Sequence, residues 1–232
     1  MKSVNISCIG YEIAADWYEG SDCVLLVLPG FTSSKANYKD LTAAIISKTG
    51  TSALVIDYSG HGESPFDVQD ITIMENFSEV VRAYDWLKKH YPDKAINVMG
   101  TSYGGFFAAM LAGVRDVNKL VLRVPANYAP KDLYTPWREL DREQIRNEYR
   151  ADPNNFKEHP VLAHGQSFKG TAYVLTHELD EACPKSSTDP YIKVFGAEAW
   201  EAKGFVHGLA KSKFTQAQLE EYQDKIAGWL NK

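Results

Sequence analysis

Apolar and polar residues are grouped in blocks along most of the chain, and the blocks have two characteristic lengths. The runs 23–28 and 52–56 are short and almost wholly apolar, which is typical of strands that a parallel sheet buries on both faces. The longer segments 36–47, 74–90 and 215–230 have helical patterns. Strands that alternate with helices in this way predict a mostly parallel sheet with helices on both faces.

The whole pattern indicates an eight-stranded sheet in a single α/β domain that spans residues 1–232. The expected strands, in chain order, are 4–8, 12–18, 23–28, 52–56, 95–99, 119–124, 171–176 and 191–195. The first alternates apolar and polar residues, as a half-exposed strand does, and the second could be its hairpin partner. One domain is the natural expectation for an α/β chain of 232 residues. Reactive groups should gather where the parallel strands reach their carboxyl ends.

The fifth expected strand leads into Gly100-Thr101-Ser102-Tyr103-Gly104, and a helical pattern of small residues follows. Gly-x-Ser-x-Gly is the form of a nucleophile elbow, a sharp strand-to-helix turn that exposes a serine hydroxyl above a sheet. A Cβ at Gly100 or Gly104 would collide with the neighbouring strand or helix. The motif alone also fits a glycine-rich connection with an incidental serine. A base, an acid and oxyanion donors are therefore needed elsewhere in the chain.

Candidates for the base and the acid follow the last two expected strands, in the order Ser, acid, His that this arrangement requires. Asp180 follows the seventh strand, and His207 follows the eighth. His207 can accept the Ser102 proton, and Asp180 can hold the imidazole in one tautomer. His177 lies too close to Asp180 in the sequence for an obvious role of this kind. Three other carboxylates compete with Asp180: Glu178, Glu181 and Asp189.

Two backbone N–H groups are expected to form an oxyanion hole. Tyr103 follows the serine, so its N–H is one donor. The second donor should come from the loop after an earlier central strand. Pro29-Gly30-Phe31-Thr32 lies there, and the Phe31 N–H is the candidate. A plain Pro-Gly turn is the alternative interpretation of this segment.

Together, these motifs resemble those of the α/β-hydrolase superfamily over nearly the whole chain. Within it, the chain is similar to small bacterial esterases of the cinnamoyl (feruloyl) esterase and monoacylglycerol-lipase-like groups. The resemblance also rests on the loop Asp57-Tyr58-Ser59-Gly60-His61-Gly62-Glu63-Ser64, and it implies that His61 is structural. It further implies that Asp180 is the acid. One departure is Pro29, where relatives usually have histidine, so the rigidity of this loop is expected to come from proline itself.

The motifs and the resemblance predict a serine hydrolase that cleaves carboxylic esters of small acyl or aryl substrates through an acyl-enzyme intermediate. No metal ion or organic cofactor is implied. A thioesterase or an amidase with the same triad is one alternative. A non-catalytic binding protein on the same fold is another, although such a protein has no need of all three groups of a triad.

The residues 125–169 form an insert between two strands that should be neighbours, and the insert is longer than their connection needs. We expect a small cap over Ser102, with Tyr134 and Trp137 in contact with an apolar acyl or aryl group. The stretch 138–150 alternates charges densely and should be a solvated helix with few core contacts. The alternative is a surface elaboration away from the pocket.

Charge and composition exclude several other classes of protein. Lys and Arg number 25 and Asp and Glu 30, so the formal net charge is −5, and no basic patch favours binding to nucleic acid. The longest apolar run is too short to span a bilayer, and we expect no signal peptide. Three widely spaced cysteines predict a reducing compartment, and hence a cytoplasmic location. The expected partner is a small-molecule ester; its identity and the oligomeric state stay open.

Overall fold

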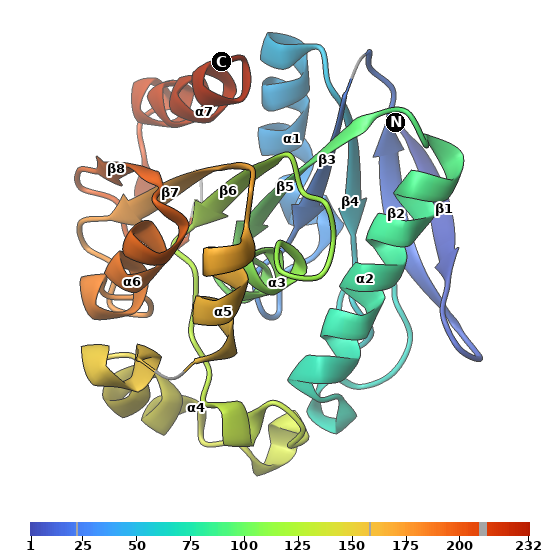
Figure 1. The fold of residues 1–232 in the computed structure, drawn as a ribbon. Helices are drawn as coiled ribbons and strands as arrows, with labels where there is room; N and C mark the ends of the chain where they lie inside the picture. The colour runs from blue at the N-terminus through green and yellow to red at the C-terminus, as the bar shows by residue number, and fades with distance from the viewer. Residues whose placement is uncertain (22, 158, 209–212) are drawn as a thin grey trace.

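The described residues form an eight-stranded sheet at the centre of the computed structural model (Figure 1). These residues are 1–21, 23–157, 159–208 and 213–232. The order across the sheet is β1-β2-β4-β3-β5-β6-β7-β8, in which β1 pairs antiparallel with β2, β2 antiparallel with β4, and the remaining pairs are parallel. The strands are β1 (Lys2–Ser7), β2 (Glu12–Tyr18), β3 (Cys23–Leu28), β4 (Ser52–Ile56), β5 (Ala95–Thr101), β6 (Lys119–Arg123), β7 (Thr171–His177) and β8 (Glu198–Ala202).

Helices cover both faces of this sheet, as the sequence predicts. In the described part of the chain the α-helices are α1 (Lys35–Thr49), α2 (Ile73–His90), α3 (Tyr103–Leu111), α4 (Arg142–Gln144), α5 (Pro160–Ser167), α6 (Lys185–Phe195) and α7 (Gln216–Leu230). The helices α1 and α7 pack together on one face, and α2, α3, α5 and α6 cover the other (Figure 1). Each face therefore has its own hydrophobic core.

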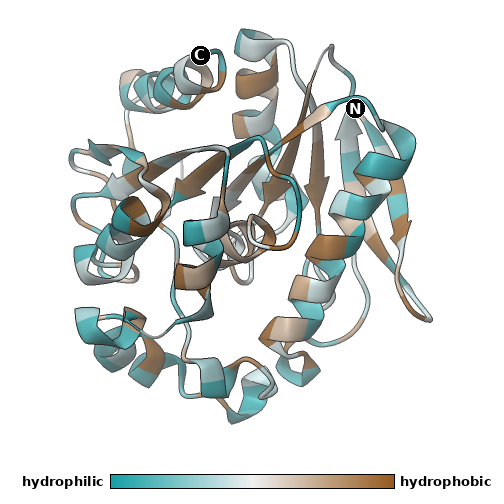
Figure 2. Ribbon diagram, viewed as in Figure 1, coloured by the Kyte–Doolittle hydropathy of each residue, from teal (hydrophilic) through white to brown (hydrophobic). Residues whose placement is uncertain are grey.

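The central strands are apolar throughout because both of their faces are buried. In β3, Val24 and Leu26 belong to the core under α2 and α3, whereas Leu25 and Val27 belong to the core under α1 and α7. All four side chains are completely buried. Figure 2 shows the central strands as the most hydrophobic part of the fold. The short apolar runs of the sequence therefore mark these strands correctly.

The eighth strand does not lie where its apolar run predicted it. Residues 191–195 are the end of α6, and the edge strand β8 is Glu198–Ala202. Tyr191 and Phe195 are one helical turn apart and both are buried, but an apolar run this short does not distinguish a helix from a strand. At the edge of the sheet only Ala202 of β8 is buried, so this strand lacks an apolar run.

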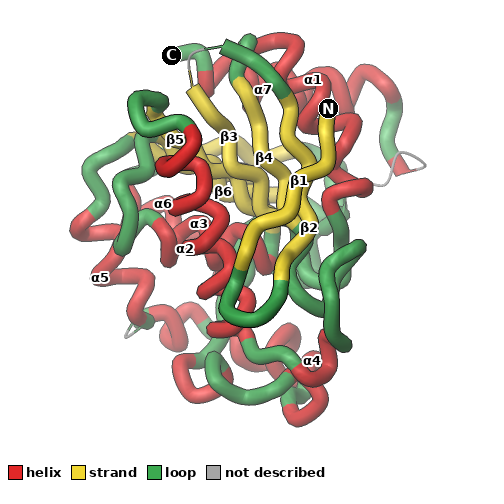
Figure 3. The backbone as a smooth tube through the Cα atoms, turned by 90° about the vertical axis from the view of Figure 1, so that its right-hand side faces the viewer, coloured by secondary structure: helices red, strands yellow, loops and turns green. Residues whose placement is uncertain are grey.

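The part of the insert 125–169 that contains α4 lies at the end of the molecule away from both chain termini, whereas α5 packs beside α3 (Figures 1 and 3). The stretch 138–150 is mostly exposed, as its charges predicted, but it is not one regular helix. Only α4 is α-helical there; a π-helical turn, Ile145–Tyr149, follows it directly. Ile145 and Arg150 are buried. The charge pattern of the sequence did not reveal these buried positions. A long arginine can bury its aliphatic stem while its guanidinium still makes hydrogen bonds.

Candidate active site

Ser102 occupies a strained turn between β5 and α3. Its backbone angles, φ 52° and ψ −111°, are ones that residues other than glycine rarely adopt. A Cβ on Gly100 would lie 2.0 Å from the carbonyl oxygen of Gly104, and a Cβ on Gly104 would lie 2.1 Å from that of Leu28. Glycine is therefore required at both positions, and the motif forms the strand-to-helix elbow that the sequence predicts.

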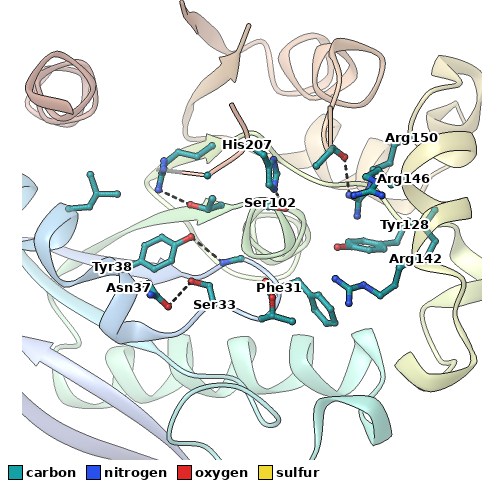
Figure 4. Close-up of a pocket in the computed structure, with 18 of the residues that line it drawn as sticks. Phe31, Ser33, Asn37, Tyr38, Ser102, Tyr128, Arg142, Arg146, Arg150 and His207 are labelled. Atoms are coloured by element: carbon teal, nitrogen blue, oxygen red, sulfur yellow. Dashed lines mark hydrogen bonds between the residues drawn. The ribbon is translucent and has the colours of Figure 1, made fainter. Parts of the chain in front are cut away.

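The structure brings His207 and Asp180 into one hydrogen-bonded chain with Ser102. Figure 4 shows Ser102 and His207 side by side at the cavity. His207 Nε2 lies 3.0 Å from Ser102 Oγ, and His207 Nδ1 lies 2.7 Å from Asp180 Oδ2. The Asp180 side chain is fully buried, and its Oδ1 accepts the N–H groups of Ala182 and Cys183, each at 2.8 Å. Because an ionised carboxylate only accepts hydrogen bonds, Nδ1 of His207 carries the hydrogen. Nε2 is left to accept the proton of Ser102.

The competing carboxylates of the same region lie elsewhere. Glu178 accepts the Gly204 N–H at 2.8 Å and pairs with Lys203 at 3.2 Å, on the surface. Glu181 and Asp189 are exposed. Of the four candidates, the structure places Asp180 against the imidazole.

One expected oxyanion donor, Tyr103, directly follows the nucleophile, and the other, Phe31, lies on a loop that approaches it. Tyr103 begins α3, and the first N–H groups of a helix have no acceptor within it. Phe31 follows Gly30, where an added Cβ would be only 3.8 Å from the Ser102 Cβ. Within the described residues, the backbone N–H of neither Phe31 nor Tyr103 is engaged in a loop or turn hydrogen bond. Both are therefore available to a ligand of Ser102.

Two tyrosines hold the loop that carries Phe31. The Tyr38 hydroxyl accepts the Gly30 N–H at 3.1 Å, and the Tyr58 hydroxyl donates to the Pro29 carbonyl at 3.0 Å. The loop thus does not depend on proline alone for its rigidity, which corrects the expectation from the sequence. His61 packs edge-on against the Phe31 ring, 5.5 Å between centroids, and its Nδ1 bonds to the Ser59 carbonyl at 3.1 Å.

A buried chain of polar groups anchors the His207 loop from behind. Arg123 Nε donates to the Tyr222 hydroxyl at 3.0 Å, which donates to His177 Nε2 at 2.8 Å. His177 Nδ1 in turn donates to the carbonyl of Val206, the residue before His207, at 2.6 Å. The direction of these hydrogen bonds is fixed because the arginine at one end only donates and the carbonyl at the other end only accepts.

This series of hydrogen bonds requires the His177 imidazole to be neutral, because its Nε2 accepts a hydrogen bond. Burial, together with the positive charge of Arg123, lowers the pKa of His177 to about 4. Sequence reasoning considered His177 only as a member of the triad, and it missed Arg123 and Tyr222. The available signal was Arg123 itself, a charged residue at the end of the buried strand β6.

A cavity of about 940 Å³ opens onto Ser102 and His207. The insert contributes seven residues to its lining: Tyr128, Trp137, Arg142, Glu143, Ile145, Arg146 and Arg150. Trp137 is buried, and its ring lies 4.0 Å from that of Phe31, centroid to centroid. Tyr134 does not line the cavity, and 74% of it is exposed, so the expectation that it contacts the substrate is corrected. Aromatic character alone did not show which ring turns inward.

The family model of the alpha/beta hydrolase fold matches residues 24–227. The chain belongs to this family. The resemblance inferred from the motifs is thereby confirmed, as is the mostly parallel eight-stranded sheet of this α/β-hydrolase. No curated protein matches the sequence. Among the described residues, no helix combines the length and the hydrophobicity that a membrane crossing needs.

Solved structures of esterases and a lipase share the fold at low sequence identity. Est1E of Butyrivibrio proteoclasticus, solved with ferulic acid, is 16% identical with a TM-score of 0.74, over 98% of this chain and 97% of that one. The esterase Pf2001 of Pyrococcus furiosus is 22% identical with a TM-score of 0.74, over 99% and 89%. The monoacylglycerol lipase of Paleococcus ferrophilus is 17% identical with a TM-score of 0.71, over 95% and 98%.

Proposed function

We propose that this α/β-hydrolase is a serine hydrolase that cleaves carboxylic esters of small acyl or aryl substrates through an acyl-enzyme. The observation that carries this proposal is the hydrogen-bonded chain from Asp180 through His207 to Ser102 at the edge of a large cavity. These three hydrogen-bonded residues supply a nucleophile, Ser102, a base, His207, and an acid that orients the base, Asp180.

Each group of the site has one step in this mechanism. Ser102 Oγ attacks the ester carbonyl while His207 Nε2 takes its proton. The N–H groups of Phe31 and Tyr103 stabilise the negative oxygen that forms. His207 returns the proton to the leaving alcohol, and a water molecule then hydrolyses the acyl-enzyme by the same route. Asp180 keeps Nδ1 protonated and stabilises the imidazolium.

The insert would act as a cap in this mechanism. Trp137 and Phe31 form an apolar wall of the cavity, and their side chains suit an acyl or aryl group. The ferulic acid bound to Est1E, a protein of the same fold, is consistent with an ester of this size. A thioester or an amide would use the same groups, and a binding protein would leave the triad unused.

A fluorophosphonate probe and a graded substrate panel test the proposal. We expect the probe to label the wild-type protein once, at Ser102, and to leave Ser102→Ala unlabelled. Aryl and alkyl esters of increasing acyl length, with matched thioesters and anilides, then rank the substrate classes. Folded wild-type protein that neither reacts with the probe nor cleaves any member of the panel would favour the binding protein.

A further inference from the structure

The cavity beside Ser102 has the opposite charge balance to the whole protein. The formal net charge of the chain is −5, yet the described residues that line the cavity include four arginines against two carboxylates, Asp40 and Glu143. Three of these arginines, Arg142, Arg146 and Arg150, come from the insert and are called here the arginine cluster. Figure 4 shows them together beside Tyr128.

The spacing of the arginine cluster places like charges on one side of a short helical segment. Its members are four residues apart, and like charges at this spacing destabilise a helix. Within the described residues, no carboxylate pairs with any of the three. Among the described residues, the arginine cluster therefore has no ion-pair partner that would offset this repulsion.

Arg150 is the most buried member, with 9% of its surface exposed. Its Nε donates to the Asn127 carbonyl at 3.1 Å and its Nη1 to the Ala182 carbonyl at 3.0 Å. The guanidinium carbon lies 4.8 Å from the centroid of the Tyr128 ring. These neutral groups hold the side chain in place but do not neutralise it. A buried charge without a counter-ion costs free energy, which a bound anion would offset.

The arginine cluster is close to the nucleophile. Cys183 Sγ lies 3.8 Å from Arg150 Nη1 and 3.9 Å from Ser102 Oγ, so one sulfur atom contacts both groups. Arg142 lies over the ring of Phe31, 4.8 Å from its centroid. An anion bound by the cluster would therefore be separated from the attacked carbonyl by only a few covalent bonds.

We propose that the ester substrate carries an anionic oxygen group, a carboxylate in its simplest form, which the arginine cluster binds during hydrolysis. This inference rests on the proposed esterase function and specifies its substrate class. The planar guanidinium fork binds a carboxylate through two parallel hydrogen bonds, which would also fix the position of the ester. The anion can belong to the acyl chain or to the alcohol.

Two pairs of esters with matched shapes test the inference and distinguish these two sources. Monoethyl succinate and ethyl 4-methylpentanoate differ by a carboxylate in the acyl chain. 4-Acetoxybenzoate and 4-isopropylphenyl acetate differ by a carboxylate in the alcohol. We expect kcat/KM to favour the charged member of at least one pair by tenfold or more, and that pair identifies the side of the ester that carries the anion.

Variants of the arginine cluster then connect the preference to these residues. Arg150→Gln should lower kcat/KM for the charged ester by about 10- to 100-fold, and by a clearly larger factor than for the neutral ester. Because Arg150 also holds two carbonyls, the double variant Arg142→Gln/Arg146→Gln, at exposed positions, tests the same point without risk to folding. Arg138→Gln is the matched control, since Arg138 pairs with Asp70 and does not line the cavity.

The outcomes separate the inference from the proposed function. The inference would be overturned if the neutral esters were cleaved as fast as the charged ones. It would also be overturned if both arginine variants kept the preference for the charged ester. Either result would leave the proposed esterase function unaffected. A wild-type protein that cleaves no ester and does not react at Ser102 with a fluorophosphonate would overturn both.

Discussion

Replacing Asp180 with asparagine tests whether this carboxylate sets the tautomer of His207. The two oxygens of Asp180 have separate tasks: Oδ1 accepts two backbone N–H groups at 2.8 Å, and Oδ2 accepts the His207 Nδ1–H at 2.7 Å. Asparagine has one acceptor oxygen and one NH₂ group, so it can satisfy only one of these tasks.

The energies of the two arrangements decide which task is kept. Turning the amide oxygen toward His207 would leave two buried N–H groups unsatisfied, at about 1–3 kcal/mol each. We therefore expect the oxygen to stay with the backbone and the NH₂ to face Nδ1. An NH₂ group only donates, so His207 must then carry its hydrogen on Nε2. That tautomer cannot accept the Ser102 proton, and we expect kcat to fall by about 10³–10⁴-fold, or roughly 4–5.5 kcal/mol of activation free energy.

Initial rates on an aryl ester measure this loss, and circular dichroism shows whether the variant is folded. Glu178→Gln is the matched control, because Glu178 lies on the same loop but bonds to Lys203 and Gly204 at the surface. Its kcat should stay within about threefold of wild type. A folded Asp180→Asn protein that keeps more than about a tenth of the wild-type kcat would refute the tautomer argument, and so would the reverse pattern between the two variants.

Three further predictions concern catalysis, acid stability and the cap. Ser102→Ala and His207→Ala should each abolish most turnover, and the double variant should lose little more than either single one, because the groups act as a unit. The pKa of His177 lies at about 4 in the fold, below the ordinary 6.5, so the unfolded chain binds the proton first; urea unfolding should show stability lost from about pH 6.5 toward pH 4, by up to about 1.4 kcal/mol per pH unit. Trp137→Leu should change the preference among long acyl or aryl esters more than for acetyl esters, whereas Tyr134→Ala should not.

Each of these predictions has an outcome that would contradict it. Multiplicative losses in the double variant would mean that one triad member is misassigned. A His177→Gln protein that loses stability between pH 6.5 and pH 4 as steeply as wild type would show that another group is responsible. Equal kinetics of the Trp137 variant across the ester series, in protein that circular dichroism shows to be folded, would place the acyl pocket elsewhere.

The sequence by itself determined the architecture and the order of the chemical groups. Burial on both faces forces a parallel central strand to be apolar, so the runs Cys23–Leu28 and Ser52–Ile56 indicated two of the central strands correctly. The elbow was also readable, because only glycine fits at positions 100 and 104. Asp180 and His207 follow late strands, and the carboxyl ends of parallel strands meet at one edge, so their proximity to Ser102 could be expected.

Only the tertiary structure decided the features that depend on long-range packing. The edge strand β8 is half-exposed, so its residues carry no apolar pattern, and the run 191–195 belongs to a helix instead. Tyr134 and Trp137 are three residues apart and similar in chemistry, yet one faces solvent and the other the cavity. The arginines of the insert looked like a solvated charged surface. Their orientation toward Ser102 depends on contacts with loops far away in the chain, such as the Ala182 carbonyl that holds Arg150, and local sequence does not encode such contacts.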